Sequence, residues 1–168
     1  YKVNSKLRLE IFDDSNINDV QLKAIYDLNQ ANYPEVGFLD SNDHLTRLIK
    51  FSSYNLIVFK ELEIVGFIIC MREGCAYQSE NYKFFTKRLK KFLYVDRIAI
   101  DINHRREGLG KSIYDDIFNL AKIESLPIAL EVNIEPINQP SLDFHQKLGF
   151  DRIGEKKFVD HSVAYFLK

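Results

Sequence analysis

The 168-residue chain is poor in the residues that mark several protein classes. It has no tryptophan, one methionine and two cysteines. Two cysteines are too few for a secreted disulfide scaffold, and Cys70 and Cys75 lack the spacing with histidines that a zinc site needs. We therefore expect buried or half-buried free thiols, a reducing cytoplasm and no bound metal.

Long apolar runs and an excess of one charge are also missing. The apolar run at 64–71 is far shorter than the roughly 20 residues of a membrane-spanning helix, and no basic-then-apolar leader pattern precedes it. Lys and Arg number 23 against 24 Asp and Glu, which gives a net charge of −1. A nucleic-acid binder usually carries a basic footprint. We expect a cytoplasmic protein that binds neither membranes nor nucleic acids.

The composition is that of a globular domain. Hydrophobic residues make up 46% of the chain, and a chain of this length buries roughly two thirds of its unfolded surface. No segment has the composition of a linker. Residues 1–168 are therefore predicted to form a single domain.

Hydrophobic periodicity predicts alternating strands and helices. Strands are expected at 7–12, 56–60, 64–72, 92–100, 127–133, 150–158 and 162–167. Helices are expected from Asn16, as an N-cap, to Tyr33 and at 42–51, 108–124 and 140–149. The connection 74–91 is unusually long. Its centre, 82–89, is predicted to be a short helix that either covers a substrate cleft or packs on the sheet.

The turn at 101–111 carries the strongest functional signal. It follows an apolar strand and precedes Leu109, Ile113 and Ile117, whose spacing places them on one helix face. The turn therefore lies at a helix N-terminus, where unpaired amides and the helix dipole attract a phosphate. Gly108 and Gly110 allow the backbone to approach a ligand closely.

Two other phosphate-binding loops are disfavoured. A Walker A motif ending at Gly110-Lys111-Ser112 would need glycine at position 105, which is arginine. A dinucleotide fingerprint would need a third glycine at position 113, which is isoleucine.

The loop instead matches a pattern of the GNAT acetyltransferase superfamily. Arg105 to Gly110 fits Arg/Gln-x-x-Gly-x-Gly/Ala, and the segment from Asn138 to Leu148-Gly149-Phe150 resembles the second conserved block of that superfamily. The chain also resembles an uncharacterised bacterial branch of the superfamily, which has a Glu-Val-Asn strand segment before the second block, as at 131–133 here. The resemblance covers most of the chain.

The resemblance implies a fold and a cosubstrate. The implied fold is a mixed α/β arrangement, with a mostly antiparallel sheet of about seven strands, helices on both faces, and a splay where the fourth and fifth strands part. The pantetheine arm of acetyl-CoA would lie in that splay. The implied cofactor-binding residues are Ile98, Ala99, Ile100, Arg105, Arg106, Glu107, Gly108, Leu109, Gly110, Lys111, Asn133, Asn138 and Ser141. Asn138 would contact the cofactor or cap the next helix.

One loop residue departs from the superfamily pattern. Glu107 stands where a basic or polar residue is common, and a carboxylate beside a pyrophosphate would weaken binding. The objection disappears if its side chain points to solvent.

The implied reaction is direct attack of an amine on the acetyl carbonyl. Because an alkylamine is mostly protonated at pH 7, a group on the protein must accept a proton. Asp96 and Glu131 are the candidate bases. For Asp96, an ion pair with a nearby basic residue such as Arg97, or a role as a solvated surface charge, is an equally good interpretation.

His145 is the candidate acid. It stands where the superfamily commonly places a tyrosine that protonates the departing thiolate. It also shares a helix face with Ser141, Phe144 and Leu148, so it is alternatively a hydrogen-bonded core histidine, and a role as a water-linked base also remains open.

Three functions are compatible with the sequence. The first is an acetyl-CoA-dependent N-acetyltransferase acting on the primary amine of a small molecule, amino acid or peptide. The second is a non-catalytic acyl-CoA-binding or regulatory module. The third is a structural protein in which 82–92 forms a homodimer surface. For the enzyme, acceptor selectivity is expected to come from 33–38 and 74–91.

Overall fold

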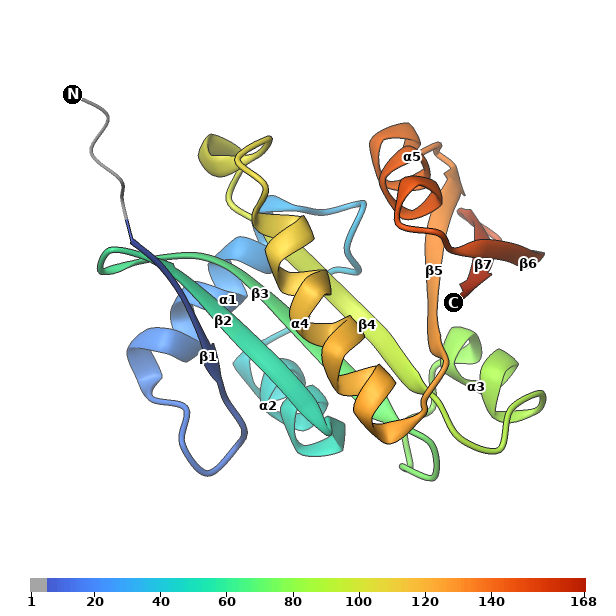
Figure 1. Cartoon of the computed structure of the whole chain (residues 1–168), viewed down its shortest axis with the longest axis horizontal. Coiled ribbons are helices and arrows are strands. Elements are labelled where there is room, and N and C mark those ends of the chain that lie inside the picture. Colours follow the sequence, from blue (N-terminus) through green and yellow to red (C-terminus); the bar gives the residue numbers. More distant parts are fainter. Residues whose placement is uncertain (1–5) are drawn as a thin grey trace.

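The computed structural model describes residues 6–168, in which one twisted sheet separates two sets of helices (Figure 1). The strands are β1 (Leu7–Ile11), β2 (Tyr54–Lys60), β3 (Glu63–Arg72), β4 (Leu93–Ile100), β5 (Ile128–Glu135), β6 (Asp151–Lys157) and β7 (Ser162–Leu167). The helices are α1 (Asp19–Ala31), α2 (Asn42–Phe51), α3 (Glu80–Thr86), α4 (Leu109–Glu124) and α5 (Gln139–Lys147), with a short 3₁₀ turn, η1 (Ile102–His104). None of the helices in this part of the chain is long and apolar enough to cross a membrane.

The sheet is mixed and mostly antiparallel, which confirms the implied fold class. Over residues 6–168 its seven strands follow the order β1-β2-β3-β4-β5-β7-β6. All neighbouring strands are antiparallel except β4 and β5, which are parallel. A parallel pair needs a crossover connection, and α4 supplies it.

Helices cover both faces of the sheet, as the resemblance implied. One core cluster joins the sheet to α1, α2 and α3 through residues such as Ile25, Leu45 and Phe85. The second joins the opposite face to α4 through Ile113 and Ile117, with α5 packed beside it. In Figure 1, α4 and α5 lie in front of the sheet and α1 and α2 lie behind it.

The first helix begins later than predicted, so the assignment of Asn16 as N-cap was wrong. Asn18 caps α1: its side chain accepts from the amide of Gln21, and the Gln21 side chain accepts from the amide of Asn18. This reciprocal capping box satisfies two otherwise unpaired amides. Asn16 instead closes the preceding turn, where its Oδ1 accepts from the Asp13 amide at 2.8 Å.

The long connection contains α3, which packs on the sheet. Tyr82 and Phe85 are buried, and the Phe84 ring stacks on Tyr165 with 3.8 Å between centroids. The packing interpretation of this segment is confirmed. Because these central rings belong to the core, they are not available to a homodimer surface at 82–92, and the homodimer itself stays a prediction. Cys70 is buried and Cys75 half-buried, and both are free, as predicted.

The splay between β4 and β5 is the feature that opens the sheet. The two strands pair only at Leu93 with Ile128 and at Tyr94 with Ala129. Beyond that point they separate, and Figure 1 shows the gap widening toward the top of the view. The register of β4 against β3 also shifts at this level, leaving Asp96 as an extra residue in a β-bulge. Bulges bend a strand and increase its twist.

A buried hydrogen bond joins α5 to α4. The Tyr114 hydroxyl lies 2.7 Å from His145 Nε2, and His145 Nδ1 lies 2.7 Å from the carbonyl oxygen of Ser141. Because a carbonyl only accepts, Nδ1 carries the proton and Nε2 accepts from the tyrosine. The two helices are thereby held in register on the same face of the sheet.

Replacing Tyr114 with phenylalanine should destabilise the fold without preventing folding. The change leaves His145 Nε2 buried without a donor, which costs about 1–3 kcal/mol. Urea unfolding of the wild type and the Tyr114→Phe variant measures this cost. An unchanged free energy of unfolding would contradict the assigned bond.

Candidate active site at the split between β4 and β5

The glycine-rich turn lies at the start of α4, as predicted. Gly108 is the N-cap residue and has φ of 80°, a left-handed conformation that favours glycine. Within residues 6–168 no side chain caps this helix end. The amides of residues 108–111 are therefore open to an external anion, which the helix dipole also favours.

The carboxylate of Glu107 does not oppose an anion at this turn. Lys60 Nζ donates to its Oε2 at 2.9 Å, and His104 Nδ1 lies 3.3 Å from the same oxygen. The hydrogen bond from Lys60 lowers the pKa of Glu107, and that of His104 adds to the effect. Lys60 and His104 thus offset the negative charge of Glu107. The side chain points toward these two residues, whereas from the sequence we considered a side chain that points to solvent.

The basic residues of the turn have different neighbours. Arg105 Nη2 donates to Asn32 Oδ1 at 2.7 Å, so this guanidinium is bound to the end of α1. Lys111 forms an exposed pair with Asp115 at 3.1 Å. Exposed pairs of this kind contribute little free energy, so the lysine can exchange its partner for a phosphate. Arg106 is exposed and has φ of 65°.

The remaining residues assigned to the cofactor lie on both sides of the split. Ile98, Ala99 and Ile100 follow the last β4–β5 pair, so their strand has no β5 partner within the described chain. Asn138 Oδ1 accepts from the Ser141 amide at 3.3 Å, so Asn138 caps α5. Asn133 contacts the segment after α1: its Nδ2 donates to the Pro34 carbonyl at 3.0 Å.

The two candidate bases occupy equivalent places on the diverging strands. Asp96 lies two residues beyond Tyr94, and Glu131 lies two residues beyond Ala129, the last paired positions. Because side chains alternate along a strand, each carboxylate faces the same side as the residue two before it, the side covered by α1 and α3. The fold therefore brings together two carboxylates that are 35 positions apart in the sequence.

Asp96 is fully engaged by its neighbours. Its side chain is 4% exposed, its Oδ1 accepts from the Tyr77 hydroxyl at 2.7 Å, and its Oδ2 accepts from Arg97 Nε at 2.8 Å. The Arg97 side chain is itself buried. The ion pair anticipated as an alternative role for Asp96 is thus present.

Glu131 has neutral donors instead of a cation. The Tyr94 hydroxyl lies 2.7 Å from Oε2 and 2.9 Å from Oε1, and Asn81 Nδ2 donates to Oε1 at 3.3 Å. Asn81 is in turn held by the Tyr165 hydroxyl at 2.8 Å. Burial raises the pKa of Glu131 to about 8, and the nearby Asp96 adds to the rise, while the bond from Tyr94 opposes it.

Sequence reasoning missed Tyr94 and Asn81 as members of this site. Alternation along β4 places Tyr94 on the same side as Asp96, which is a signal that the sequence contains. Asn81 carries no such signal, because its position depends on how α3 docks against β5.

His145 lies on the opposite face of the sheet from the carboxylates. It is buried between α4 and α5, and both ring nitrogens are hydrogen-bonded. Burial lowers its pKa, with the Ser141 carbonyl opposing the shift. These surroundings fit the alternative interpretation, a hydrogen-bonded core histidine, better than a proton donor to a thiolate.

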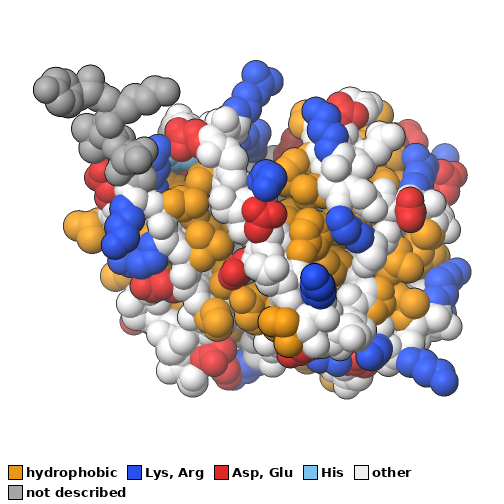
Figure 2. Space-filling model, viewed as in Figure 1, with side chains coloured by type: hydrophobic (Ala, Val, Ile, Leu, Met, Phe, Trp, Pro, Cys, Tyr) orange, Lys and Arg blue, Asp and Glu red, His pale blue; other side chains and the backbone are white. Residues whose placement is uncertain are grey.

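An aromatic pair is exposed on the segment that follows α1. Tyr33 is 59% and Phe38 55% exposed, and their rings meet edge to face with 5.7 Å between centroids. The Asn133–Pro34 hydrogen bond fixes this segment beside the carboxylate face. Figure 2 also shows hydrophobic side chains at the surface between the parts of the molecule that carry α4 and β5.

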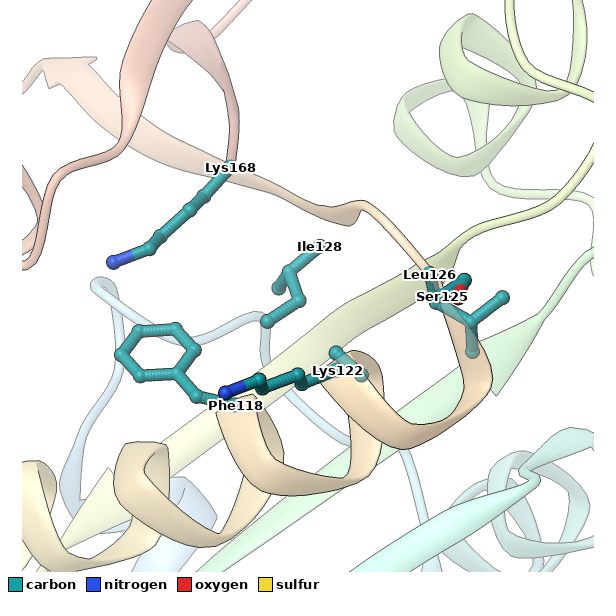
Figure 3. Close-up of a pocket in the computed structure, with 7 residues that line it drawn as sticks. Phe118, Lys122, Ser125, Leu126, Ile128 and Lys168 are labelled. Atoms are coloured by element: carbon teal, nitrogen blue, oxygen red, sulfur yellow. The ribbon is translucent and has the colours of Figure 1, made fainter.

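A cavity of about 340 Å³ lies elsewhere, at the closed end of the split (Figure 3). Phe118 and Lys122 from α4, Ile128 from β5 and Lys168 line it, and the Lys168 ammonium lies 4.3 Å from the centre of the Phe118 ring. The cavity includes neither carboxylate and lies at the far end of α4 from the glycine-rich turn. Within residues 6–168 no cluster of three or more His, Cys, Asp or Glu side chains is placed to hold a metal ion.

Known proteins resemble this chain in sequence and in fold. N-alpha-acetyltransferase 50 of Danio rerio is 28% identical over 156 residues, which is 90% of this chain and 80% of the relative. The structure of Arabidopsis thaliana NAA60 in complex with acetyl-CoA superposes with a TM-score of 0.73 at 11% identity, covering 97% of this chain and 98% of the other. The ribosomal-protein-S18-alanine N-acetyltransferase of Escherichia coli gives 0.67 at 14% identity, covering 95% and 92%.

The sequence model of the Acetyltransferase (GNAT) family matches residues 22–150, a stretch that includes the open helix end, the split strands and both carboxylates. Enzymes of this family use acetyl-CoA and transfer its acetyl group to amines. The chain therefore belongs to the GNAT family of N-acetyltransferases.

Proposed function

We propose that this enzyme acetylates the α-amine of a peptide or amino acid by direct attack, with Glu131 as the proton acceptor. The observation that carries the proposal is the position of Glu131 just beyond the last β4–β5 pair, where Tyr94 and Asn81 hold it. Neither partner neutralises its charge. A carboxylate in such a place can accept a proton from an amine that approaches from the α1 side.

The residues around the split suit a bound acetyl-CoA, which supplies an activated thioester. The amides of residues 108–111 would hold the pyrophosphate, with Arg106 and Lys111 beside them. The free edge of β4 at 98–100 would bind the pantetheine amides. Leu109 would contribute through its backbone at the start of α4, and Asn138 and Ser141 would contribute at the start of α5.

The surroundings of Glu131 give it a pKa that suits a general base. A peptide α-amine has a pKa of about 7.7–8.0, and burial raises the pKa of Glu131 to about 8. Proton transfer between groups of similar pKa is close to thermoneutral, which is the favourable condition for general base catalysis. As the new C–N bond forms and the C–S bond breaks, the amine proton passes to Glu131. The leaving group departs as the CoA thiolate and takes up a proton from solvent; because its thiol has a pKa of about 8.5, the thiolate needs little help to leave.

Asp96 is the weaker candidate for the base. Its two oxygens already accept from Tyr77 and Arg97, and the arginine charge holds it in the ionised form. Taking a proton would break a buried ion pair. We assign Asp96 to the support of the site.

The α-amine is proposed as the acceptor because of the exposed aromatic pair. Tyr33 and Phe38 present apolar surface on the segment that Asn133, two residues from Glu131 on β5, contacts. Such a surface suits an amine that is flanked by an apolar side chain, as in a peptide with leucine first. The activity named for the Danio rerio relative, N-alpha-acetylation, supports the same class.

The Glu131→Gln variant tests the proposal directly. The probes are synthetic octapeptides with leucine, glycine or lysine first, with α-amine-blocked versions, and acetylation is followed by mass spectrometry. The wild type should modify the free α-amine of the leucine peptide. The variant should lose 10²- to 10⁴-fold in kcat, the usual contribution of a general base.

Glu135→Gln is the matched control, because it removes an exposed carboxylate from the same strand. It should keep wild-type kcat. Activity confined to lysine side chains, or full activity in Glu131→Gln, would refute the proposal for the acceptor or for the base.

The raised pKa of Glu131 also predicts a pH dependence of stability. Glu131 ionises with a pKa near its ordinary 4.5 in the unfolded chain and near 8 in the folded one, so the folded state binds the proton more tightly. Its stabilising contribution is complete below pH about 4.5 and is lost as the pH rises to about 8. The free energy of unfolding of the wild type, minus that of Glu131→Gln, should fall over this range in urea titrations. A flat difference would show that Glu131 is ionised like a surface carboxylate.

Charge reversal at the start of α4 should weaken cofactor binding. Lys111→Glu places a negative charge beside the amides of residues 108–111, where it would repel a bound pyrophosphate. The Kd for acetyl-CoA, measured by calorimetry, should rise at least tenfold. Lys122→Glu makes the same change near the other end of the helix and is the matched control. Equal effects of the two variants would argue against a pyrophosphate at the turn.

A further inference from the structure

The two diverging strands each reach the same segment of the chain. From β4, Arg97 Nη1 donates to the Gly37 carbonyl at 3.1 Å and to Asn29 Oδ1 at 2.9 Å. From β5, Asn133 Nδ2 donates to the Pro34 carbonyl at 3.0 Å. The segment between these contacts, residues 33–38, is the light-blue loop that follows α1 in Figure 1, and we call it the acceptor wall.

The bulge in β4 explains how Arg97 comes to face the acceptor wall. Val95 pairs with Cys70 and Arg97 with Ile69, so Asp96 is inserted between consecutive pairs. Asp96 and Arg97 therefore both reach the side covered by α1, where Asp96 balances the arginine charge at 2.8 Å. Their side chains are 4% and 8% exposed. A paired and hydrogen-bonded arginine of this kind holds its neighbours in fixed geometry.

Asn133 plays the corresponding part on β5. It lies two residues beyond Glu131 and so on the same face of the strand. Its amide contact therefore fixes the acceptor wall relative to the strand that carries the base.

Both strands bind the acceptor wall through backbone carbonyls, those of Pro34 and Gly37. The side chains of Tyr33 and Phe38 take no part in these contacts and remain exposed. The wall is thus fixed in place while its apolar surface stays available to a ligand.

We propose that Arg97 and Asn133 are positioning residues that set the distance between the acceptor wall and Glu131 and thereby determine which amines are acetylated. The inference rests on the proposed function and assigns specificity within the same site. Asn133, implied by the resemblance to contact the cofactor, serves the acceptor through its side chain. An amine whose neighbouring group packs on Tyr33 and Phe38 is delivered to Glu131 only while both contacts hold.

The Asn133→Ala variant tests the inference through separate kinetic parameters. With the leucine-first octapeptide, KM should rise about tenfold, the effect of one lost hydrogen bond of about 1.4 kcal/mol. The Kd for acetyl-CoA and the pH profile of kcat should stay at their wild-type values, because neither the phosphate turn nor Glu131 is altered. The preference for the leucine peptide over the glycine peptide should shrink. Asn119→Ala, on the exposed side of α4, is the matched control and should change nothing.

A second measurement does not require activity. Amide hydrogen exchange at 33–38 should be faster in Asn133→Ala and in Arg97→Lys. The lysine variant keeps the positive charge but loses the guanidinium group that binds Asn29 and Asp96 at the same time. Exchange in α4 and β7 should stay unchanged.

The outcomes separate this inference from the proposed function. If the wild type modifies none of the peptides, the proposed acceptor is wrong, and the exchange data alone decide whether these residues hold the wall. Unchanged exchange at 33–38 overturns the inference. So does an Asn133→Ala variant whose Kd for acetyl-CoA rises while the KM of the peptide does not, since Asn133 would then be a cofactor contact.

Discussion

The parting of β4 from β5 after Tyr94 and Ala129 is the constraint on which the rest of the structure depends. A parallel pair that continued would have used the backbone donors and acceptors of residues 95–100, and the sheet would have been closed. The split leaves that edge available and lets side chains of both strands face a common space. The start of α4, which follows β4 after η1 and the glycine-rich turn, lies toward the open end of the gap. In the proposed function, cofactor and acceptor meet at this split from opposite faces of the sheet.

Burial divides the charged groups at the split into two kinds. Asp96 and Arg97 form a buried ion pair, whereas Glu131 is surrounded by hydroxyl and amide donors and is the group that we propose as the proton acceptor. The same low-polarity surroundings that raise the pKa of Glu131 also make this side chain costly to ionise, so its ionised form lowers the stability of the fold. This is the pattern expected where two nearby carboxylates have different roles.

Much of the fold was predictable, because local patterns carried it. Helical spacing and glycine placement located α4 within one residue of its observed start, and alternation located the strands. The wrong N-cap at Asn16 arose because two asparagines two positions apart offer the same local signal. Arg105, Arg97 and Asn133 each have a partner in α1 or the segment after it, far away in the sequence. Such contacts depend on how the helices pack against the sheet, and the hydrophobic periodicity of the sequence does not predict that packing.

A crystal structure of the complex with acetyl-CoA tests the central claim most directly. The account predicts the pantetheine arm between β4 and β5, the pyrophosphate on the amides of residues 108–111, and the acetyl carbon on the side of the sheet that Glu131 faces. A cofactor bound in the cavity beside Phe118, with the β4 edge at 98–100 left free, would contradict it.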